Sequence, residues 1–511
     1  MFYVLNMYKN VSYSTHLLLQ IRHKSKTHWA KLKKKTSPKY KAMNLFDEFY
    51  GSIFGNKWEG IREGLLRRSK YAAVINNYGD PEETMEYLTN RGAHCLRNLI
   101  KVQKEFQEQY NPMPKPEKPS DPTIKLQQFA EKLHSDEISN IYPHNGNMPD
   151  KLDLSELEEV YEGSKKKKET INIPTKTLEQ SLAEAEIDES RIIDPSIGMT
   201  SESLYQFLPA TKLKGMDDWI PESSHYSYYS TNTDFPLAIE PEAELIYPEH
   251  LKVFTYEMHS EYDDFPEPKR CQTGVYNYYP MDCGSVVAVL ALGLEAGDRV
   301  LDLCSAPGGK ALVALQTLLP DVVICNDVSI SRSNRTKRIF KDYLFDFETS
   351  NKWRERVVFK RVDGRHFTDD YGFDKVLVDV PCTTDRHSVN EDENNIFRPD
   401  RIKERLKIPE MQSALLTNAL RLVKVGGAVV YSTCSLSPVQ NDGVVHMALK
   451  HAFESANVVA AVKDLTSPLR GLGGALRLCA GPAAPRYGQL VLPSVAANFG
   501  PTYIAKLVRV K

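Results

Sequence analysis

The C-terminal half of the chain alternates short apolar runs with helical stretches, and this pattern restricts the fold more than any other feature. The runs RVLDLC (299–304), DVVICND (321–327) and KVLVDV (375–380) consist mainly of Val, Leu and Ile. Each is followed, directly or after a loop, by a stretch of helical periodicity. Continuous apolar strands separated by helices are typical of a parallel sheet covered by helices on both faces. We therefore predict an α/β domain over residues 237–511.

Two of the predicted strands end in a cysteine. KVLVDV ends at Val380 and is followed by Pro381 and Cys382. The run AVVYSTC (428–434) ends in Cys434. A free cysteine is most often a small buried hydrophobe, so either thiol alone would indicate little. Because ligands bind beyond the carboxyl ends of the strands in such sheets, both thiols should face one site. Their pairing favours a chemical role.

A glycine-rich turn follows the first of these strands. Gly308 and Gly309 allow a tight turn and a close approach to a ligand, and the helix that follows offers free N–H groups. The turn is not a phosphate loop of the form GxxxxGK[ST], because Cys304 occupies its first position and Ala311 its last. It does not match GxGxxG either, which makes a dinucleotide site a weak interpretation.

Acidic residues end the next two predicted strands. Asp327 can accept hydrogen bonds from a ribose diol, as acidic residues do in dinucleotide sites. Asp363 and Gly364 follow the run RVVFKRVDG (356–364) and are suited to the edge of an adenine. Together these strand ends predict a nucleoside site.

Five motifs in fixed order resemble those of the NSUN (Nol/Nop/Sun) family of RNA (cytosine-5)-methyltransferases. They are LDLCSAPGGK, ICNDVS, VDGR, VLVDVPCTTDRHSV and VVYSTCSLSPVQND. The resemblance covers about residues 265–511 and is greatest to the mitochondrial ribosomal-RNA branch. It implies a Rossmann-like sheet that binds S-adenosyl-L-methionine. The sequence MDCGS (281–285) departs from the more usual MDGAS, and residues 111–236 have no counterpart.

The resemblance also implies roles for the site residues. Cytosine C5 is a poor nucleophile, but addition of a thiolate to C6 activates it. The family pattern assigns this attack to Cys434, release of the product to Cys382, and a contact with the base and the cofactor to Asp379. A thiol with a pKa near ~8.5 needs help to ionise, for which a helix N-terminus and Arg386 are candidates. The implied cofactor contacts are Gly308, Gly309, Lys310, Asp327, Arg332, Asp363, Gly364 and Asp379.

Several of these cofactor residues have a second interpretation. Gly308 and Gly309 also fit a simple tight turn, and Asp363 fits a turn cap. Arg332 also fits a solvated helix face, because it lies in the charged stretch SISRSNRTKR.

The first 46 residues differ in composition from the rest of the chain. They contain ten Lys and Arg, from Lys9 to Lys41, and no Asp or Glu. With the amphipathic stretch HLLLQIRHK, this composition is typical of a mitochondrial transit peptide and predicts a location in the matrix. A solvated basic arm that touches nucleic acid and a nuclear signal in KLKKK remain alternatives.

The remaining organisation is simpler. Residues 47–110 carry helical periodicity and predict a helical segment, whereas residues 111–236 are Pro-rich or charged and predict a largely disordered tether. None of the eight cysteines has CxxC spacing, so neither a metal cluster nor a disulfide framework is expected. No run approaches the ~18 apolar residues of a membrane span. The net charge of −2 does not by itself indicate a nucleic-acid binder.

The favoured function is therefore methylation of mitochondrial small-subunit ribosomal RNA in support of ribosome assembly. A tRNA or DNA cytosine-5 methyltransferase is an alternative, although the second thiol in YSTCS argues against a DNA enzyme. A ribosome-assembly factor whose binding role outweighs catalysis is another. No appended RNA-binding module is recognisable, and a base in a duplex must be flipped out or offered single-stranded. The resemblance to the mitochondrial branch implies a partner protein of the mitochondrial termination-factor family.

Overall fold

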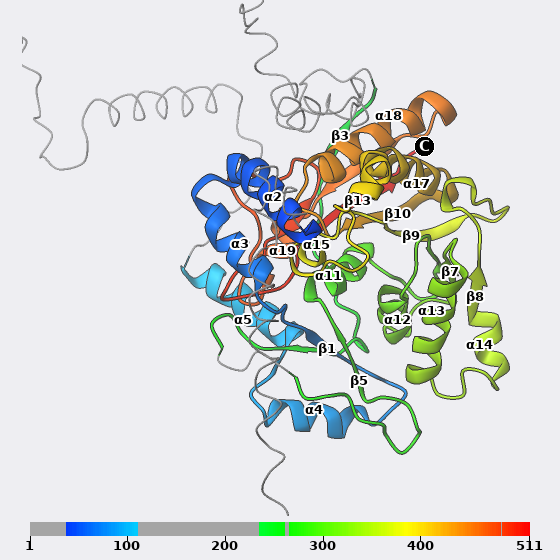
Figure 1. The fold of residues 1–511 in the computed structure, drawn as a ribbon. Helices are drawn as coiled ribbons and strands as arrows, with labels where there is room; N and C mark the ends of the chain where they lie inside the picture. Colours follow the sequence, from blue (N-terminus) through cyan, green and yellow to red (C-terminus); the bar gives the residue numbers. More distant parts are fainter. Residues whose placement is uncertain (1–36, 111–234, 261–264, 482) are drawn as a thin grey trace, which may run out of the picture. The chain divides into compact units, whose positions relative to one another are not determined.

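The computed structural model describes residues 37–110, 235–260, 265–481 and 483–511 (Figure 1). The predicted transit peptide, up to residue 36, and the predicted tether, up to residue 234, lie outside the described residues. The described residues up to Glu105 and from Phe235 onward belong to one compact unit.

A large sheet carries the predicted strand ends. Its order is β3-β11-β13-β10-β9-β6-β7-β8, and β12 pairs with β13. The strands are β3 (Ala238–Pro241), β6 (Arg299–Asp302), β7 (Val322–Asn326), β8 (Val357–Lys360), β9 (Phe373–Asp379), β10 (Val423–Thr433), β11 (Ala460–Asp464), β12 (Gln489–Val491) and β13 (Thr502–Arg509). The predicted α/β architecture is confirmed.

One strand departs from the predicted parallel arrangement. β13 runs antiparallel to β10, β11 and β12, whereas the other pairs are parallel. A parallel neighbour requires a crossover connection, usually a helix, and no helix lies between β12 and β13. The last strand therefore returns in the opposite direction, and the sheet is mixed but mainly parallel.

Helices cover both faces of the sheet because successive strand residues point to opposite sides. Val376 and Val429 belong to one hydrophobic core, together with α17 (Ile408–Leu422) and α18 (Val444–Ala456). Their neighbours Leu377 and Val430 belong to the other core. That second core contains side chains of α11 (Cys283–Leu292), α12 (Gly309–Gln316), α13 (Ile330–Tyr343) and α14 (Asn351–Arg356).

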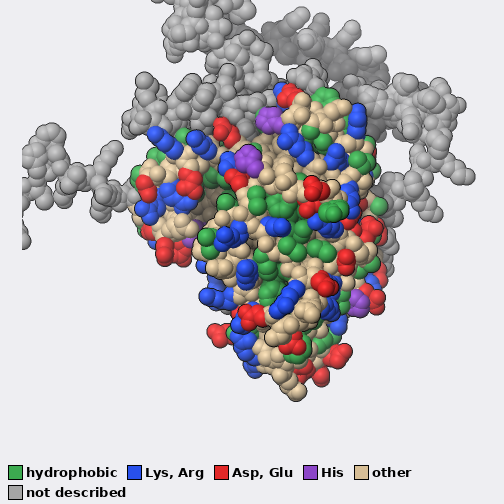
Figure 2. All heavy atoms as spheres, turned by 90° about the vertical axis from the view of Figure 1, so that its right-hand side faces the viewer, with side chains coloured by type: hydrophobic (Ala, Val, Ile, Leu, Met, Phe, Trp, Pro, Cys, Tyr) green, Lys and Arg blue, Asp and Glu red, His purple; other side chains and the backbone are tan. Residues whose placement is uncertain are grey.

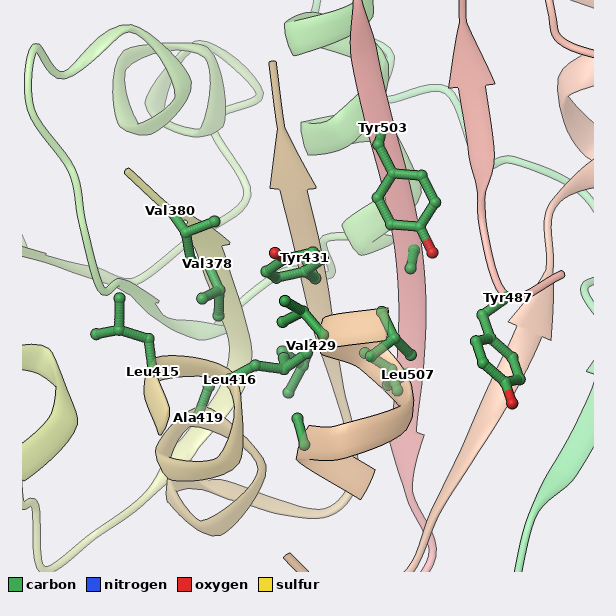
Figure 3. Close-up of a cluster of buried hydrophobic side chains, with 14 of the residues drawn as sticks. Val378, Val380, Leu415, Leu416, Ala419, Val429, Tyr431, Tyr487, Tyr503 and Leu507 are labelled. Carbon is green, nitrogen blue, oxygen red and sulfur yellow. The ribbon is translucent and has the colours of Figure 1, made fainter. Parts of the chain in front are cut away.

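Figure 3 shows the first core at close range. Leu415, Leu416 and Ala419 of α17 lie against Val378 of β9 and Val429 of β10. Leu416 and Ala419 are fully buried. This packing fixes α17 beneath the ends of the two strands that lead to the predicted thiols.

The N-terminal segment contains strands as well as the predicted helices. Its helices are α2 (Pro38–Phe54), α3 (Trp58–Leu66), α4 (Pro81–Thr89) and α5 (Leu96–Tyr110). The strands β1 (Ala72–Ile75) and β2 (His94–Cys95) join β4 (Val253–Thr255) and β5 (Tyr278–Met281) in an antiparallel sheet of order β2-β4-β1-β5. The run AAVI is too short for its periodicity to separate a strand from a helix, so pairing with distant residues decides it.

Helix α2 crosses the boundary that the sequence places after residue 46. It begins at Pro38, and it buries Ala42, Met43, Phe46 and Tyr50 on one face. The packed part of the chain therefore starts within the segment assigned to the basic leader.

Shorter elements complete the unit. They are α15 (Asp385–Asn390), α16 (Ile402–Leu406), α19 (Thr466–Leu469), the 3-10 turns Gly55–Lys57, Gly364–His366, Pro399–Arg401 and Arg470–Leu472, and a π-helical turn at Val439–Gly443.

Over the described ranges, no helix combines the length and the apolar character that a membrane crossing requires. The same ranges hold no cluster of three or more His, Cys, Asp or Glu side chains suited to a metal ion.

Candidate active site

The structure brings the two predicted thiols together. β9 and β10 are parallel neighbours in which Asp379 lies opposite Ser432, so the loops after both strands emerge side by side. Cys382 Sγ lies 2.9 Å from Cys434 Sγ, and the Cys434 backbone N–H donates a hydrogen bond to Cys382 Sγ. Both cysteines are free; Cys382 is half-buried and Cys434 is exposed. A substrate can therefore reach the Cys434 sulfur.

The surroundings of Cys434 favour its neutral thiol. The hydrogen bond with Cys382, as the largest cause, and nearby acidic charges raise the pKa of Cys434 well above its ordinary value. The Arg386 guanidinium does not offset this effect. Its nitrogens donate instead to the Asn498 side chain and to carbonyl oxygens of Gly64, Arg67 and Gly500. The suggested aid from Arg386 is therefore not what the structure shows, and Arg386 holds the loop after α3 and the chain before β13.

An ion pair fixes the carboxylate of Asp379 beside the thiol loops. Lys310 Nζ lies 2.7 Å from Asp379 Oδ2, and the Ser432 hydroxyl donates to Asp379 Oδ1 at 2.8 Å. Burial alone would lower the pKa of Lys310, but the attraction of Asp379 raises it overall. Lys310 therefore carries its charge, and both oxygens of Asp379 are held in place.

A buried carboxylate next to this pair was missed by sequence reasoning. Asp302 is almost fully buried at the end of β6, and its two oxygens have no hydrogen-bond partner among the described residues. Burial, with the charge of Asp379 as a second cause, raises the pKa of Asp302 to about 8. The signal that pointed to Asp327, an acidic residue at the end of an apolar strand, applies equally to Asp302.

Four of the predicted cofactor residues line one cavity. Its volume is about 220 Å³, and it lies beyond the ends of β6, β7 and β8. The Asp327 side chain is buried there, with its Oδ2 3.2 Å from an Arg332 nitrogen, while Asp363 pairs with Arg365 at 2.6 Å. The lining residues are Leu303, Cys304, Asn326, Asp327, Val328, Arg332, Asp363, Gly364, Arg365, Pro381, Met411 and Leu415.

The predicted glycines allow close packing around this cavity. Gly308 has φ 107°, and a Cβ there would lie 2.6 Å from Thr336 Cγ2 of α13. A Cβ on Gly364 would lie 2.7 Å from a Leu415 methyl group of α17. Gly308, Gly309, Lys310 and Asp379 do not line this cavity, although Asp379 lies two residues before the lining residue Pro381.

A second, larger cavity adjoins the first on the side of the thiols. Its volume is about 610 Å³, and its lining includes Cys382 together with Arg401 and Lys407. It shares Arg332, Arg365, Pro381 and Met411 with the smaller cavity. The two cavities thus meet at residues that border both.

A buried carboxylate ties the two thiol loops to each other. Asp385 accepts hydrogen bonds from Thr383 Oγ1, Ser435 Oγ and the Leu436 backbone N–H, while its own N–H donates to the Cys434 carbonyl. Tyr50 of α2 donates to Asp385 Oδ2 at 2.8 Å. Burial raises the pKa of Asp385, and the hydrogen bonds oppose that shift. Asp385 therefore links α2, the Cys382 loop and the Cys434 loop.

Comparison with known proteins identifies the family. The 5-cytosine rRNA methyltransferase nsun-4 of Caenorhabditis elegans is 34% identical over 503 residues, which cover 96% of this chain and 97% of that protein. The chain belongs to the NSUN4-like 5-cytosine rRNA methyltransferases. The family described as 16S rRNA methyltransferase RsmB/F matches residues 289–479. NSUN4 of Xenopus tropicalis is 31% identical over 96% of this chain and 95% of its own length.

Among solved structures, NSun6 from Pyrococcus horikoshii is 23% identical, with a TM-score of 0.36, over 48% of this chain and 57% of that one. The predicted family is confirmed by the full-length relatives. As a member of the NSUN4-like group, the chain is an S-adenosylmethionine-dependent rRNA (cytosine-5)-methyltransferase.

Proposed function

We propose that this chain methylates C5 of a cytosine in mitochondrial small-subunit ribosomal RNA and so supports assembly of the mitochondrial ribosome. The observation that carries the proposal is the pair of thiols, whose sulfurs lie 2.9 Å apart beside a cavity of about 610 Å³. Full-length relatives named as 5-cytosine rRNA methyltransferases support the choice of substrate. The basic leader supports the mitochondrial address.

The residues of the smaller cavity fit S-adenosylmethionine, which supplies a methyl group on a positively charged sulfur. The buried carboxylate of Asp327 is suited to accept hydrogen bonds from the ribose hydroxyls. Asp363 and Gly364 are suited to contact the adenine ring. Asp302 precedes the cavity residues Leu303 and Cys304, and its unpartnered carboxyl group, protonated near neutral pH because its pKa is raised to about 8, offers one donor and one acceptor. The other proposed contacts are Gly308, Gly309, Lys310, Arg332 and Asp379.

Cys434 is the proposed nucleophile. Because its pKa is raised in the free chain, Cys434 must pass its proton to a base when the cytosine arrives, and the Asp379 carboxylate, whose charge acts on this thiol, is the proposed acceptor. The thiolate then forms a bond to cytosine C6, and the electron pair that leaves the C5–C6 double bond makes C5 nucleophilic. Lys310 and Ser432 hold the Asp379 carboxylate in the position from which it contacts the base.

Cys382 is proposed to act after C5 has gained the methyl group. The proton on C5 must leave, and the electrons of that bond restore the double bond while the bond from C6 to Cys434 breaks. We propose that the deprotonated Cys382 sulfur accepts this proton and so becomes the thiol; its position 2.9 Å from the departing Cys434 sulfur supports this role. The resemblance to the mitochondrial branch further implies a partner of the termination-factor family that helps to present the base.

Bisulfite sequencing tests the proposed function. In cells that lack the protein, we expect one cytosine of mitochondrial small-subunit ribosomal RNA to lose its 5-methyl mark. Expression of the wild-type chain should restore the mark, and expression of the Cys434→Ala variant should not. A mark lost only from cytosolic RNA would contradict the mitochondrial address. Restoration of ribosome assembly by Cys434→Ala without the mark would favour a binding role over catalysis.

Asp327→Ala should weaken binding of S-adenosylmethionine. The substitution removes a buried acceptor, which corresponds to about 1–3 kcal/mol, or roughly a 5- to 150-fold rise in Kd. Calorimetry with the purified chain measures the change. The matched control is Asp321→Ala, because Asp321 is exposed immediately before the start of β7, at the opposite end of that strand. A folded Asp327→Ala protein with wild-type affinity would remove Asp327 from the site.

A further inference from the structure

Helix α13 carries a row of cations on its exposed face. Arg332, Arg335, Arg338 and Lys341 follow one another at three-residue spacing, and all four are exposed. The face of the helix toward the sheet buries Ser333, Thr336, Phe340 and Tyr343. Residues three apart are neighbours on a helix, so the four cations form a continuous row that winds about half-way around the exposed side of α13.

The helix has little in its own surroundings to offset this charge. Like charges at this spacing destabilise a helix, and Arg332 in the first turn opposes the helix dipole. The one acidic residue of α13, Asp342, pairs with Arg270 instead. Arg335 and Arg338 make no ion pair with another described residue, whereas Lys341 pairs with the exposed Glu348. A merely solvated helix face would gain from acidic residues in the row, so the arrangement indicates an anionic ligand.

The row connects the proposed active site to a third hollow. At one end, Arg332 borders both the cofactor cavity and the thiol-side cavity. At the other end, Arg338 and Lys341 line a hollow of about 500 Å³ between α13, α14 and β8. Figure 2 looks onto this side of the molecule, where Lys and Arg side chains are distributed among acidic ones.

The third hollow joins cations to aromatic surfaces. Its lining includes Lys337 and Arg354 together with Phe347, Trp353 and Phe359. Lys337 Nζ lies 5.2 Å from the centre of the Phe359 ring. From Arg332 to Lys341 the row extends about 14 Å along the helix axis, at the helical rise of ~1.5 Å per residue. A surface of that length can contact several neighbouring phosphates of one nucleic-acid strand.

We propose that Arg335, Arg338 and Lys341, with Lys337 and Arg354 of the adjoining hollow, form a docking surface for the phosphate backbone of the RNA that carries the target cytosine. We call this set the basic track. The proposal rests on the proposed function, because Arg332, which precedes the track on α13, borders the cavity that would receive the base. Contacts to phosphates position a nucleic acid without reading its sequence. The basic track would thus hold RNA that flanks the target, while the base itself enters the thiol-side cavity.

The test removes two cations that line neither the cofactor cavity nor the thiol-side cavity. The full chain and the Arg335→Gln/Arg338→Gln variant are titrated with labelled fragments of small-subunit ribosomal RNA between 0.05 and 0.2 M salt. If each arginine neutralises one phosphate, the wild-type affinity should fall about 7- to 12-fold more over this range than that of the variant. The KM for RNA should rise, and the affinity for S-adenosylmethionine should remain unchanged.

Two control variants separate charge at this place from charge in general. Arg91→Gln/Lys101→Gln removes the same charge at exposed positions just after α4 and on α5, which lie away from α13 in Figure 1. It should keep the wild-type salt dependence. Arg335→Lys/Arg338→Lys preserves the charge and should also keep it, with an unchanged melting temperature showing that the fold is intact.

An Arg335→Gln/Arg338→Gln protein with the wild-type salt dependence would overturn the proposal. It would instead favour an anionic protein as the ligand of the basic track. Equal effects of the two glutamine variants would overturn it as well, since binding would then depend only on total charge. The salt titration does not require catalysis. If the wild-type chain binds RNA but transfers no methyl group, the proposed function fails while the basic track is still tested.

Discussion

Cys382→Ala should trap the protein on its RNA, whereas Cys434→Ala should form no adduct and transfer no methyl group. Without Cys434 no bond to C6 can form, and loss of a nucleophile lowers kcat on the order of 10⁶-fold in other enzymes. Without Cys382, addition and methylation proceed but the C5 proton lacks its acceptor, so the bond from Cys434 to C6 persists. A denaturing gel with labelled RNA and S-adenosylmethionine measures the adduct directly.

The same gel distinguishes the alternatives. An adduct with Cys434→Ala would reverse the two roles and make Cys382 the nucleophile. An adduct with neither variant would show that a group other than Cys382 takes the proton. Cys271→Ala is the control, because Cys271 is also a free, half-buried thiol but does not border either site cavity. It should behave as the wild type.

Asp385→Asn should lower both the stability and the kcat. An amide can replace only part of the carboxylate, so at least two of the hydrogen bonds to a charged acceptor are lost. At about 1.5–3 kcal/mol each, the free energy of unfolding should fall by roughly 3–6 kcal/mol. Because the two thiol loops lose their link, the thiols shift relative to each other, and a displacement of ~1 Å costs about 10²-fold in rate. Chemical denaturation and single-turnover methylation measure the two effects.

A milder variant keeps this prediction testable if Asp385→Asn does not fold. Tyr50→Phe removes one hydroxyl donor from Asp385 and keeps the aromatic ring. Because this is one hydrogen bond to the same charged acceptor, it should cost about 1.5–3 kcal/mol and leave the affinity for S-adenosylmethionine unchanged. A wild-type denaturation midpoint in both variants would show that the Asp385 hydrogen bonds contribute nothing to the fold.

The positions of the two thiols were predictable from sequence because the determining feature is local. An apolar run fixes where a strand ends, and parallel neighbouring strands end at the same edge of a sheet. The meeting of Cys382 and Cys434 therefore required only that β9 and β10 be neighbours. The position of Asp327 in the site was predictable for the same reason, because it follows an apolar strand. The same reasoning would have predicted Asp302.

The hydrogen-bond network around Asp385 was not predictable in this way. It joins Tyr50 to residues more than 330 positions later in the chain, and no spacing within a motif records that contact. The strand at AAVI was missed for a related reason, since β1 exists because it pairs with β4 and β5. Contacts between distant segments decide both features, and periodicity within a segment cannot reveal them.

The contacts of α2 and of Ser37 before it with residues 385–392 set a limit on how much of the N-terminus can be removed without loss of the anchor. Ser37 and the Lys39 backbone bind Asp392, and Tyr50 reaches Asp385. A protease that removes a leader must therefore cut before Ser37 to leave this anchor intact. If the proposed leader is removed by proteolysis, trimming that ran ten residues further would delete the first part of α2, so the accuracy of that cleavage would determine how much of the protein is active.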